Sequence, residues 1–260
     1  MTSRAIEFYN ASEPARRGRE DQPAELAETS RWLLSAPPGV VLELGCGHGA
    51  LSALSPRYLG IDLGFVGLYK KRFRCAGADM ERLPFRDESI AFIFSWAAIE
   101  HVPRPELVLA EIERVLAPEG VALLAPAWHC RPWAAEGLEF RPYRELGLFQ
   151  RFRKALIPFR NSLVWRAPFA IFPRLSREFR ASRGQRLSFS YARLEPNLDE
   201  YIGTDCDAFT SMDPHAAIMY FSSRGWRIPS HPSRRARLLA RSEPVVVLKP
   251  PRAGRGSSST

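Results

Sequence analysis

The chain alternates between short, continuously apolar runs and segments whose apolar positions repeat with helical spacing. Segments of the first kind predict buried strands at residues 39–45, 57–62, 72–79, 89–96 and 120–128. Segments of the second kind predict helices at residues 23–36, 49–55 and 105–118, the last with an apolar face of Leu107, Ala110, Ile112, Val115 and Leu116. Strands that are apolar throughout and alternate with helices are typical of a parallel sheet covered on both faces.

This alternation stops near residue 129, where the chain becomes rich in Arg, Phe, Trp and Pro. It resumes with a helix at residues 213–226, for which Asp213 is the expected N-cap, Pro214 the first helical residue and Gly225 the end. Strands at 226–230 and 243–250 follow. We therefore expect an N-terminal helical segment at 1–38, a core domain formed by 39–129 and 198–250, an inserted lid or substrate region at 130–197, and a disordered tail at 251–260.

Charge is concentrated in the inserted region. The chain of 260 residues has a net charge of +9, and between Arg131 and Arg193 there are 14 Arg and Lys residues against four Glu and no Asp. Such a local excess indicates an anionic partner, such as phosphate, nucleic acid or a lipid surface, although a solvated, arginine-rich lid would show the same pattern. Prolines at positions 158, 168 and 173 should break this region into short helical pieces.

The bulk composition excludes several classes of protein. No apolar run of about 18 residues is present, so no membrane-spanning helix is expected. The four cysteines show neither a CxxC pair nor metal-ligand spacing, and the N-terminus lacks the apolar core of a signal peptide. These features predict a cytoplasmic protein with reduced thiols, either a monomer or a homodimer, which the basic region could also bring to a membrane surface.

A glycine-rich turn follows the first predicted strand. Gly45, Gly47 and Gly49 are spaced GxGxG, and Glu43 interrupts the apolar run before them. Glycines at this point allow the backbone to approach a ligand closely, and a buried carboxylate needs a partner such as an ammonium group. The turn therefore predicts a ligand site rather than packing alone.

Two further carboxylates end the next two strands. Asp62 closes the second strand and Asp79 the third, and the carboxyl ends of parallel strands meet at the ligand-binding edge of a sheet. A carboxylate at Asp62 could bind both hydroxyls of a ribose. Asp79 could accept the exocyclic amine of an adenine, with Met80 as part of an apolar floor. The pattern favours an adenosine-containing cofactor.

Four ordered blocks carry a family resemblance: "VLELGCGHG", "YLGID", "GADMERLPFRDESIAFIFSWAAIEHV" and "EIERVLAPEGVALLAPAW". With these blocks the sequence resembles the class I S-adenosylmethionine-dependent methyltransferases, and more narrowly the methyltransferase type 11 branch. The resemblance covers roughly residues 40–128, and the last helix and strand extend it to residue 249. It implies an α/β fold, a Rossmann-like doubly wound seven-stranded sheet with a reversed last strand, here with an inserted basic and aromatic lid.

The resemblance also implies a cofactor site for S-adenosyl-L-methionine. The glycine turn would line the methionine part, and the residues after the fourth strand would flank the sulfonium. No resident metal is implied. The residues that the resemblance places at the cofactor are Glu43, Gly45, Cys46, Gly47, Asp62, Leu63, Asp79, Met80, Ser95 and Trp96.

Methylation of a hydroxyl needs a base, which makes the histidines candidate catalytic residues. His101 follows the fourth strand and His129 the fifth, so both are expected at the ligand edge. His215 opens the late helix beside Asp213. It could be a base or part of a metal cluster with Asp205, Asp207 and Asp213, or it could simply occupy the first turn of a helix that Asp213 caps.

The acceptor substrate is less constrained. Residues 194–226 resemble methyltransferases of surface-polysaccharide or glycosylated natural-product pathways, which favours O-methylation of a small molecule or a saccharide-containing intermediate, free or linked to a lipid. The alternatives are N- or C-methylation of a small molecule, an RNA methyltransferase, and a non-catalytic cofactor-binding or scaffold protein. "SWAAIE" replaces the (N/D)PPY-type loop after the fourth strand, so nucleic acid is not the expected partner. Whether the N-terminal segment around Tyr9 and Arg17 closes over the cofactor stays open.

Overall fold

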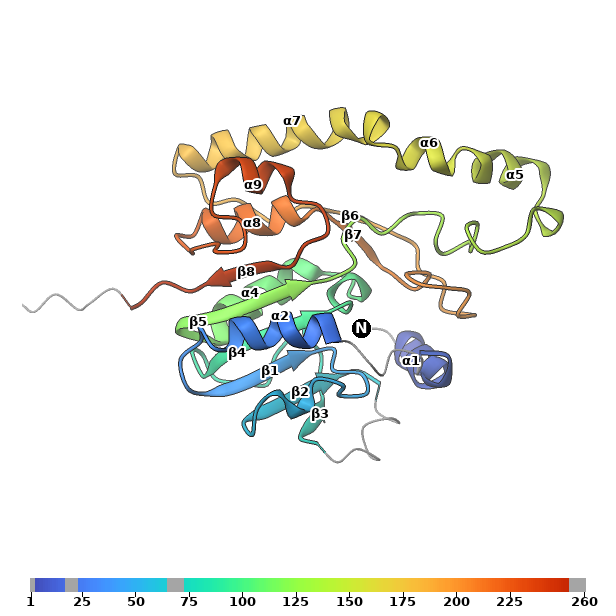
Figure 1. Ribbon diagram of the computed structural model, residues 1–260. Helices are drawn as coiled ribbons and strands as arrows, with labels where there is room; N and C mark the ends of the chain where they lie inside the picture. The colour runs from blue at the N-terminus through green and yellow to red at the C-terminus, as the bar shows by residue number, and fades with distance from the viewer. Residues whose placement is uncertain (1–2, 17–22, 65–72, 253–260) are drawn as a thin grey trace, which may run out of the picture.

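The computed structural model describes residues 3–16, 23–64 and 73–252, and its centre is a six-stranded sheet in the order β3-β2-β1-β4-β5-β8 (Figure 1). All neighbouring strands are parallel except β8, which runs antiparallel to β5. This arrangement confirms the doubly wound α/β fold with a reversed last strand. The strands are β1 (Val40–Leu44), β2 (Tyr58–Asp62), β3 (Cys75–Gly77), β4 (Ile90–Trp96), β5 (Leu116–Ala125) and β8 (Val245–Leu248).

Alternate side chains of the central strands enter two separate cores. Leu42 and Leu44 of β1 pack into the core shared with α4 (Pro105–Val115) and α8 (Pro214–Ser222). Val41 packs on the other face, against α2 (Pro23–Leu33). Because both faces of the sheet are covered, its strands are apolar on both sides, as the sequence pattern indicates.

The buried face of α4 is rotated from the expected one. The helix buries Val108, Leu109, Ile112 and Val115, whereas Ala110 is exposed. It also ends at Val115, and Leu116 already belongs to β5. Residues 49–55, expected as a helix, contain only the 3-10 turn η1 (Ser52–Leu54).

The expected seventh strand at residues 226–230 is reduced to one isolated bridge, between Arg227 and Leu248. Pro229 has no backbone N–H to donate to the sheet. Beside it, the Ser230 hydroxyl accepts a hydrogen bond from the Val246 N–H at 2.9 Å, so a side chain takes the place of a backbone partner. The described residues therefore form six strands in this sheet.

The region expected as an insertion forms a row of helices at the top of the molecule in Figure 1: α5 (Leu148–Ala155), α6 (Ile157–Asn161) and α7 (Leu163–Ser182), after the short turn η3 (Tyr143–Glu145). The prediction that prolines would fragment it is wrong for α7, which continues through Pro168 and Pro173. Packing of α7 on α8 and α9 (Arg234–Leu239) outweighs the local cost of proline. No helix within the described residues is both long and apolar enough to cross a bilayer.

Two smaller features complete the fold. A two-stranded antiparallel sheet, β6 (Tyr191–Arg193) with β7 (Thr210–Met212), links the helical row to α8. At the other end of the chain, α1 (Ser3–Arg16) lies beside the carboxyl ends of the parallel strands (Figure 1). Of the tail expected to be disordered, residues 253–260 lie outside the described part, and the proposed domain limits remain predictions.

Candidate functional site

The glycine turn after β1 has the geometry that only glycine adopts easily. Gly45 and Gly47 have φ angles of 77° and 45°, in the left-handed region. A Cβ on Gly45 would lie 2.3 Å from the Cβ of Ala98, whereas a Cβ on Gly47 would have no atom within 4 Å. The turn therefore packs tightly on one side and leaves exposed backbone next to open space on the other, as a close-fitting ligand requires.

Asp62 connects this turn to the end of β2. One carboxylate oxygen accepts a hydrogen bond from the Gly47 N–H at 2.8 Å, and the other accepts one from the Gly64 N–H at 2.9 Å. A carboxylate offers about four acceptor positions, so both oxygens can also accept ribose hydroxyls. Leu63, the next residue, is half-buried at the same edge.

Asp79 and Met80 reach the site from the end of the third strand. Asp79 accepts a hydrogen bond from the Glu81 N–H at 2.9 Å, which fixes the turn that follows β3. The Met80 Cε lies 3.7 Å from the position that a Gly45 Cβ would occupy, so this buried side chain borders the glycine turn. The structure thus places Met80 beside the glycine turn, and its role as an apolar floor for the adenine remains a prediction.

Four other residues that were predicted at the cofactor make hydrogen bonds within the protein. The buried Glu43 accepts a hydrogen bond from the Tyr58 hydroxyl; burial and the Glu43 charge raise the pKa of Tyr58. Ser95 is fully buried and donates to the Leu44 carbonyl at 2.9 Å. The remaining two are also engaged: the Trp96 indole donates to the hydroxyl of Thr29 in α2 at 3.0 Å, and the buried Cys46 donates its N–H to Ile61. Their roles toward the cofactor remain predictions.

His101 lies in a cluster of buried acids. Its Nδ1 is 3.1 Å from an Asp207 carboxylate oxygen, and its Nε2 is 3.8 Å from the Glu100 carboxylate. The His101 side chain is 16% exposed, while both carboxylates are buried. Burial raises the pKa of Glu100, whose carboxylate accepts the Ala127 N–H. The short turn η2 (Ile99–His101) begins directly after Ala98, the residue packed against Gly45.

The residues around His101 differ from one alternative that the sequence offered, and they place the N-terminal helix near the strand ends. In that alternative Asp207 was grouped with His215, whereas in the structure Asp207 pairs with His101. Tyr9 of α1 approaches the same histidine, with ring centroids 6.2 Å apart. A side chain on Gly64 would contact Tyr9 at 3.9 Å, so α1 borders the strand ends, while Arg17 lies outside the described residues. Glu100, adjacent to His101 in the chain, is the signal that sequence reasoning passed over.

His129 and His215 occupy different surroundings. His129 has a φ of 63° and donates its backbone N–H to Met212 of β7 at 2.9 Å. His215 is fully buried in the first turn of α8, and Asp213 caps that helix by accepting the His215 N–H at 3.1 Å. This confirms the expected cap. In the described part of the chain, no group of three or more His, Cys, Asp or Glu residues could hold a metal ion.

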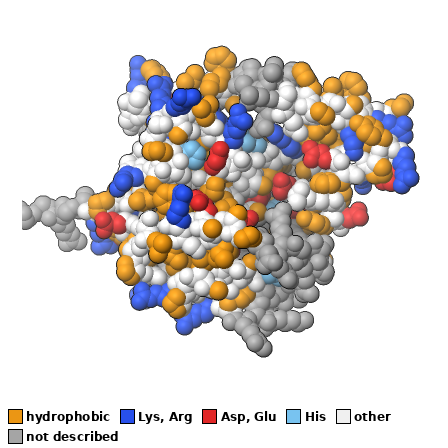
Figure 2. Space-filling view, in the orientation of Figure 1, with side chains coloured by type: hydrophobic (Ala, Val, Ile, Leu, Met, Phe, Trp, Pro, Cys, Tyr) orange, Lys and Arg blue, Asp and Glu red, His pale blue; other side chains and the backbone are white. Residues whose placement is uncertain are grey.

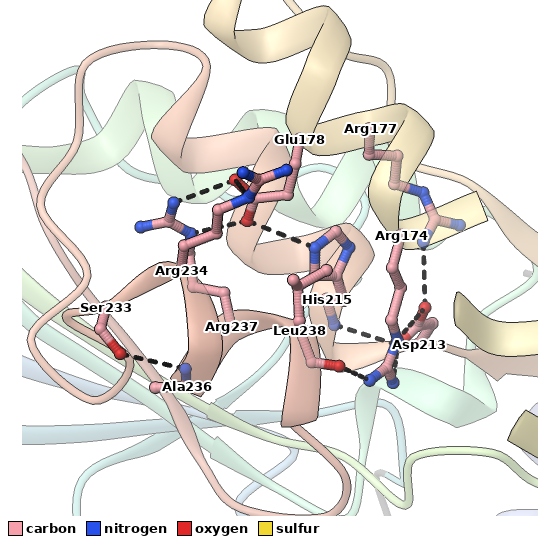
Figure 3. Close-up of polar contacts among 10 residues, drawn as sticks. All are labelled: Arg174, Arg177, Glu178, Asp213, His215, Ser233, Arg234, Ala236, Arg237 and Leu238. Atoms are coloured by element: carbon pink, nitrogen blue, oxygen red, sulfur yellow. Dashed lines mark hydrogen bonds and ion pairs between the residues drawn. The ribbon is translucent and has the colours of Figure 1, made fainter. Parts of the chain in front are cut away.

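The side chain of His215 belongs to a polar cluster between α7, α8 and α9 (Figure 3). Its Nε2 lies 3.6 Å from a Glu178 carboxylate oxygen, and Glu178 accepts hydrogen bonds from Arg237. Arg174 and Arg177 form ion pairs with Asp213 at 2.7 and 2.9 Å. These contacts join the helical row to the core, and His215 lies within them; its predicted catalytic role remains a prediction.

Protonation of His215 should destabilise the fold. Burial lowers its pKa from 6.5 to about 4, so between these values only the unfolded chain binds the proton. Stability should therefore fall as the pH drops from about 6.5 to about 4, by up to about 3 kcal/mol from this group. Urea unfolding across that pH range measures the slope, and His215→Gln should flatten it. His231, whose pKa burial also lowers, is present in both proteins and cancels. An unchanged slope in the variant would assign the effect to other groups.

Comparison with known proteins agrees with this geometry. Residues 42–124 match the family described as "Methyltransferase domain", of type 11. The chain is 35% identical over 170 residues to phthiotriol/phenolphthiotriol dimycocerosates methyltransferase of Mycobacterium tuberculosis, covering 57% of this chain and 63% of that protein. It is 33% identical over 102 residues to malonyl-[acyl-carrier protein] O-methyltransferase of Halorhodospira halophila, covering 34% and 35%.

Among solved structures, CalS10, an amino pentose methyltransferase from Micromonospora echinaspora with bound S-adenosylmethionine, is 24% identical. The match covers 46% of this chain and 57% of CalS10, with a TM-score of 0.37. The family match spans the glycine turn, Asp62, Asp79 and His101, the same residues that the fold brings to one edge of the sheet. Residues 42–124 of this chain are therefore similar to the type 11 methyltransferase domains, and the match includes most of the residues predicted to hold S-adenosylmethionine.

Proposed function

We propose that this protein transfers the methyl group of S-adenosylmethionine to a hydroxyl oxygen of a small biosynthetic intermediate that is linked to a lipid or contains a saccharide. The observation that carries the proposal is the His101–Asp207 pair, 3.1 Å apart, in the segment that follows Ala98 and the glycine turn. A hydroxyl is a poor nucleophile until its proton is removed, and a partly exposed imidazole held by a buried carboxylate can accept that proton.

The glycine turn and two carboxylates have the shape and charge to hold the cofactor. The open space beside Gly47 can accommodate the methionine part of the cofactor. Asp62 can bind the ribose hydroxyls while it holds the glycine turn in place. Met80 and Asp79 would face the adenine. When bound, the cofactor supplies a methyl group already activated by the positive charge on its sulfur. The protein's task is to orient the acceptor and exclude water.

Asp207 and Glu100 each affect how His101 can accept a proton. The Asp207 carboxylate lies 3.1 Å from the His101 Nδ1 and favours a proton on that nitrogen, which would leave the basic lone pair on Nε2. Burial raises the pKa of Glu100 and so favours its neutral form, which leaves the Asp207 carboxylate as the main charge acting on the imidazole. Once His101 is protonated, the Asp207 charge stabilises the imidazolium that forms.

The acceptor class rests on relatives and on the helical row. The relative from Mycobacterium tuberculosis is named for its action on dimycocerosate lipids, and that from Halorhodospira halophila for O-methylation of an acyl-carrier substrate. The chain spans 63% of the length of the mycobacterial protein. The exposed aromatic side chains of α5 and α6 would suit an acceptor that is partly apolar.

The test is a transfer assay with S-adenosylmethionine carrying a labelled methyl group. A panel of lipids and glycolipids, each with one free hydroxyl, should include an acceptor that gains the label and one methyl group by mass spectrometry. The matched control is the same compound with that hydroxyl replaced by hydrogen, which should stay unlabelled. Transfer to amine-bearing or RNA substrates only, or equal labelling of the deoxy control, would contradict O-methylation.

A further inference from the structure

An apolar stripe runs along the outer side of α5 and α6. Its members are 37–85% exposed, and at 100° per residue they fall within an arc of about 100°. Leu156 joins the two helices in a helical conformation and its N–H bonds to the Phe152 carbonyl, so the stripe is nearly continuous. The apolar stripe consists of Leu148, Phe149, Phe152, Leu156 and Phe159.

The inner face of the same helices is already packed. Ile157 is buried in a small core with Trp133, Leu138 and Leu146. Arg153 on the inner side pairs with Glu136 at 2.6 Å. The apolar stripe is thus additional to the surface that these helices need for folding, and contiguous exposed apolar surface of this kind marks an interaction site.

The row of helices extends the stripe onto α7. Phe172 and Phe179 of α7 are exposed, while Arg174 and Glu178, on the opposite side, are buried against the core. The helices α5, α6 and α7 lie in a row along one edge of the molecule (Figure 1), so the exposed apolar side chains of all three belong to the same edge. Figure 2 shows hydrophobic and basic side chains interspersed over the upper right, where α5 and α6 lie.

Basic side chains flank the apolar stripe. Arg151 and Arg160 are exposed on either side of it, and Arg144 is exposed just before α5. The segment from Arg131 to Arg193 carries an excess of ten positive charges. A surface that combines exposed Leu and Phe with Arg is complementary to an anionic lipid headgroup layer above acyl chains.

We propose that the apolar stripe docks onto the surface of a bilayer containing anionic lipids. Its phenylalanine and leucine side chains enter the headgroup boundary, and the flanking arginines contact lipid phosphates. A second copy of the chain would bring two strongly positive surfaces together, which disfavours self-association here. RNA bases could stack on the aromatic side chains, but the aliphatic Leu148, the most exposed member of the apolar stripe, would contribute nothing to such stacking. Docking does not depend on the proposed methyl transfer.

The experiment is flotation of the full chain with vesicles of phosphatidylcholine alone or mixed with phosphatidylglycerol. The protein should float with the anionic vesicles, and less so as salt rises. The double variant Phe149→Ser/Phe152→Ser should lower the apparent affinity at least about tenfold, since each phenylalanine loses apolar burial. Leu34→Ser is the control: Leu34 is 89% exposed but follows α2, outside the apolar stripe, and its loss should change nothing. Circular dichroism verifies that both variants fold.

Three outcomes would overturn the proposal. The wild-type protein could fail to float with anionic vesicles, or the double variant could float as well as the wild type. The same substitutions could instead abolish binding to polyuridylate or dissociate a dimer in sedimentation velocity while leaving vesicle binding intact, which would assign the apolar stripe to RNA or to a second copy. Because vesicle binding is measured without cofactor or acceptor, a failure here leaves the methyl-transfer proposal standing, and the reverse also holds.

Discussion

Replacing His101 by alanine should lower the turnover number for methyl transfer by about 10²–10⁴-fold, the usual contribution of a positioned base. His101 lies three residues after Ala98, which packs on the glycine turn, and its Nδ1 is 3.1 Å from Asp207. Without the imidazole, the acceptor hydroxyl loses its proton only to water. Affinity for S-adenosylmethionine, measured by calorimetry, should stay close to that of the wild type.

Asp207→Asn separates a catalytic role of His101 from a structural one. The asparagine keeps the size of the side chain but removes the charge that stabilises the imidazolium, which lowers the pKa of His101, so turnover should fall and the acidic limb of the pH–rate profile should move toward lower pH. His129→Ala is the comparison, because His129 is the other histidine expected at the ligand edge, and if His101 is the base this variant should keep a rate closer to that of the wild type. A wild-type rate in His101→Ala, or a loss of activity fully explained by weaker cofactor binding, would remove His101 from the mechanism.

Asp62→Ala should weaken binding of S-adenosylmethionine by about 10²-fold or more. A hydrogen bond to a charged group contributes about 1.5–3 kcal/mol, and the carboxylate would provide two to the ribose. It also accepts the Gly47 and Gly64 N–H groups, so its loss releases the glycine turn from β2. Calorimetry with the purified protein gives the dissociation constant directly.

Two controls define what this loss would mean. Asp87→Ala removes an exposed carboxylate that pairs with Arg114, away from the glycine turn, and should leave cofactor affinity unchanged. Asp62→Asn keeps an acceptor oxygen but directs an amide toward one of the two backbone donors, so it should bind the cofactor more weakly than wild type. Equal affinity in Asp62→Ala and wild type would show that the ribose is held elsewhere.

Features coded within a few adjacent residues were predictable from the sequence. The apolar run followed by glycines predicted β1 and its turn, because burial and positive φ angles are properties of single positions. Asp213 followed by Pro214 predicted the start of α8, since a cap and its helix are neighbours in the chain. The alternation of strands and helices also predicted the parallel sheet, and the family resemblance implied the antiparallel β8.

Features that depend on distant segments were decided by the tertiary structure alone. The Asp207 partner of His101 is 106 positions away along the chain, and the sequence pattern did not pair them. The rules for proline predicted broken helices, but packing against α8 and α9 sustains α7 through Pro173. The sequence by itself determined the six strands of the main sheet, the glycine turn and the carboxylates at the strand ends, because local sterics and periodic burial suffice for these. The tertiary structure alone decided which histidine pairs with which acid and which helix face stays exposed, because each packed element covers part of its neighbours' surface.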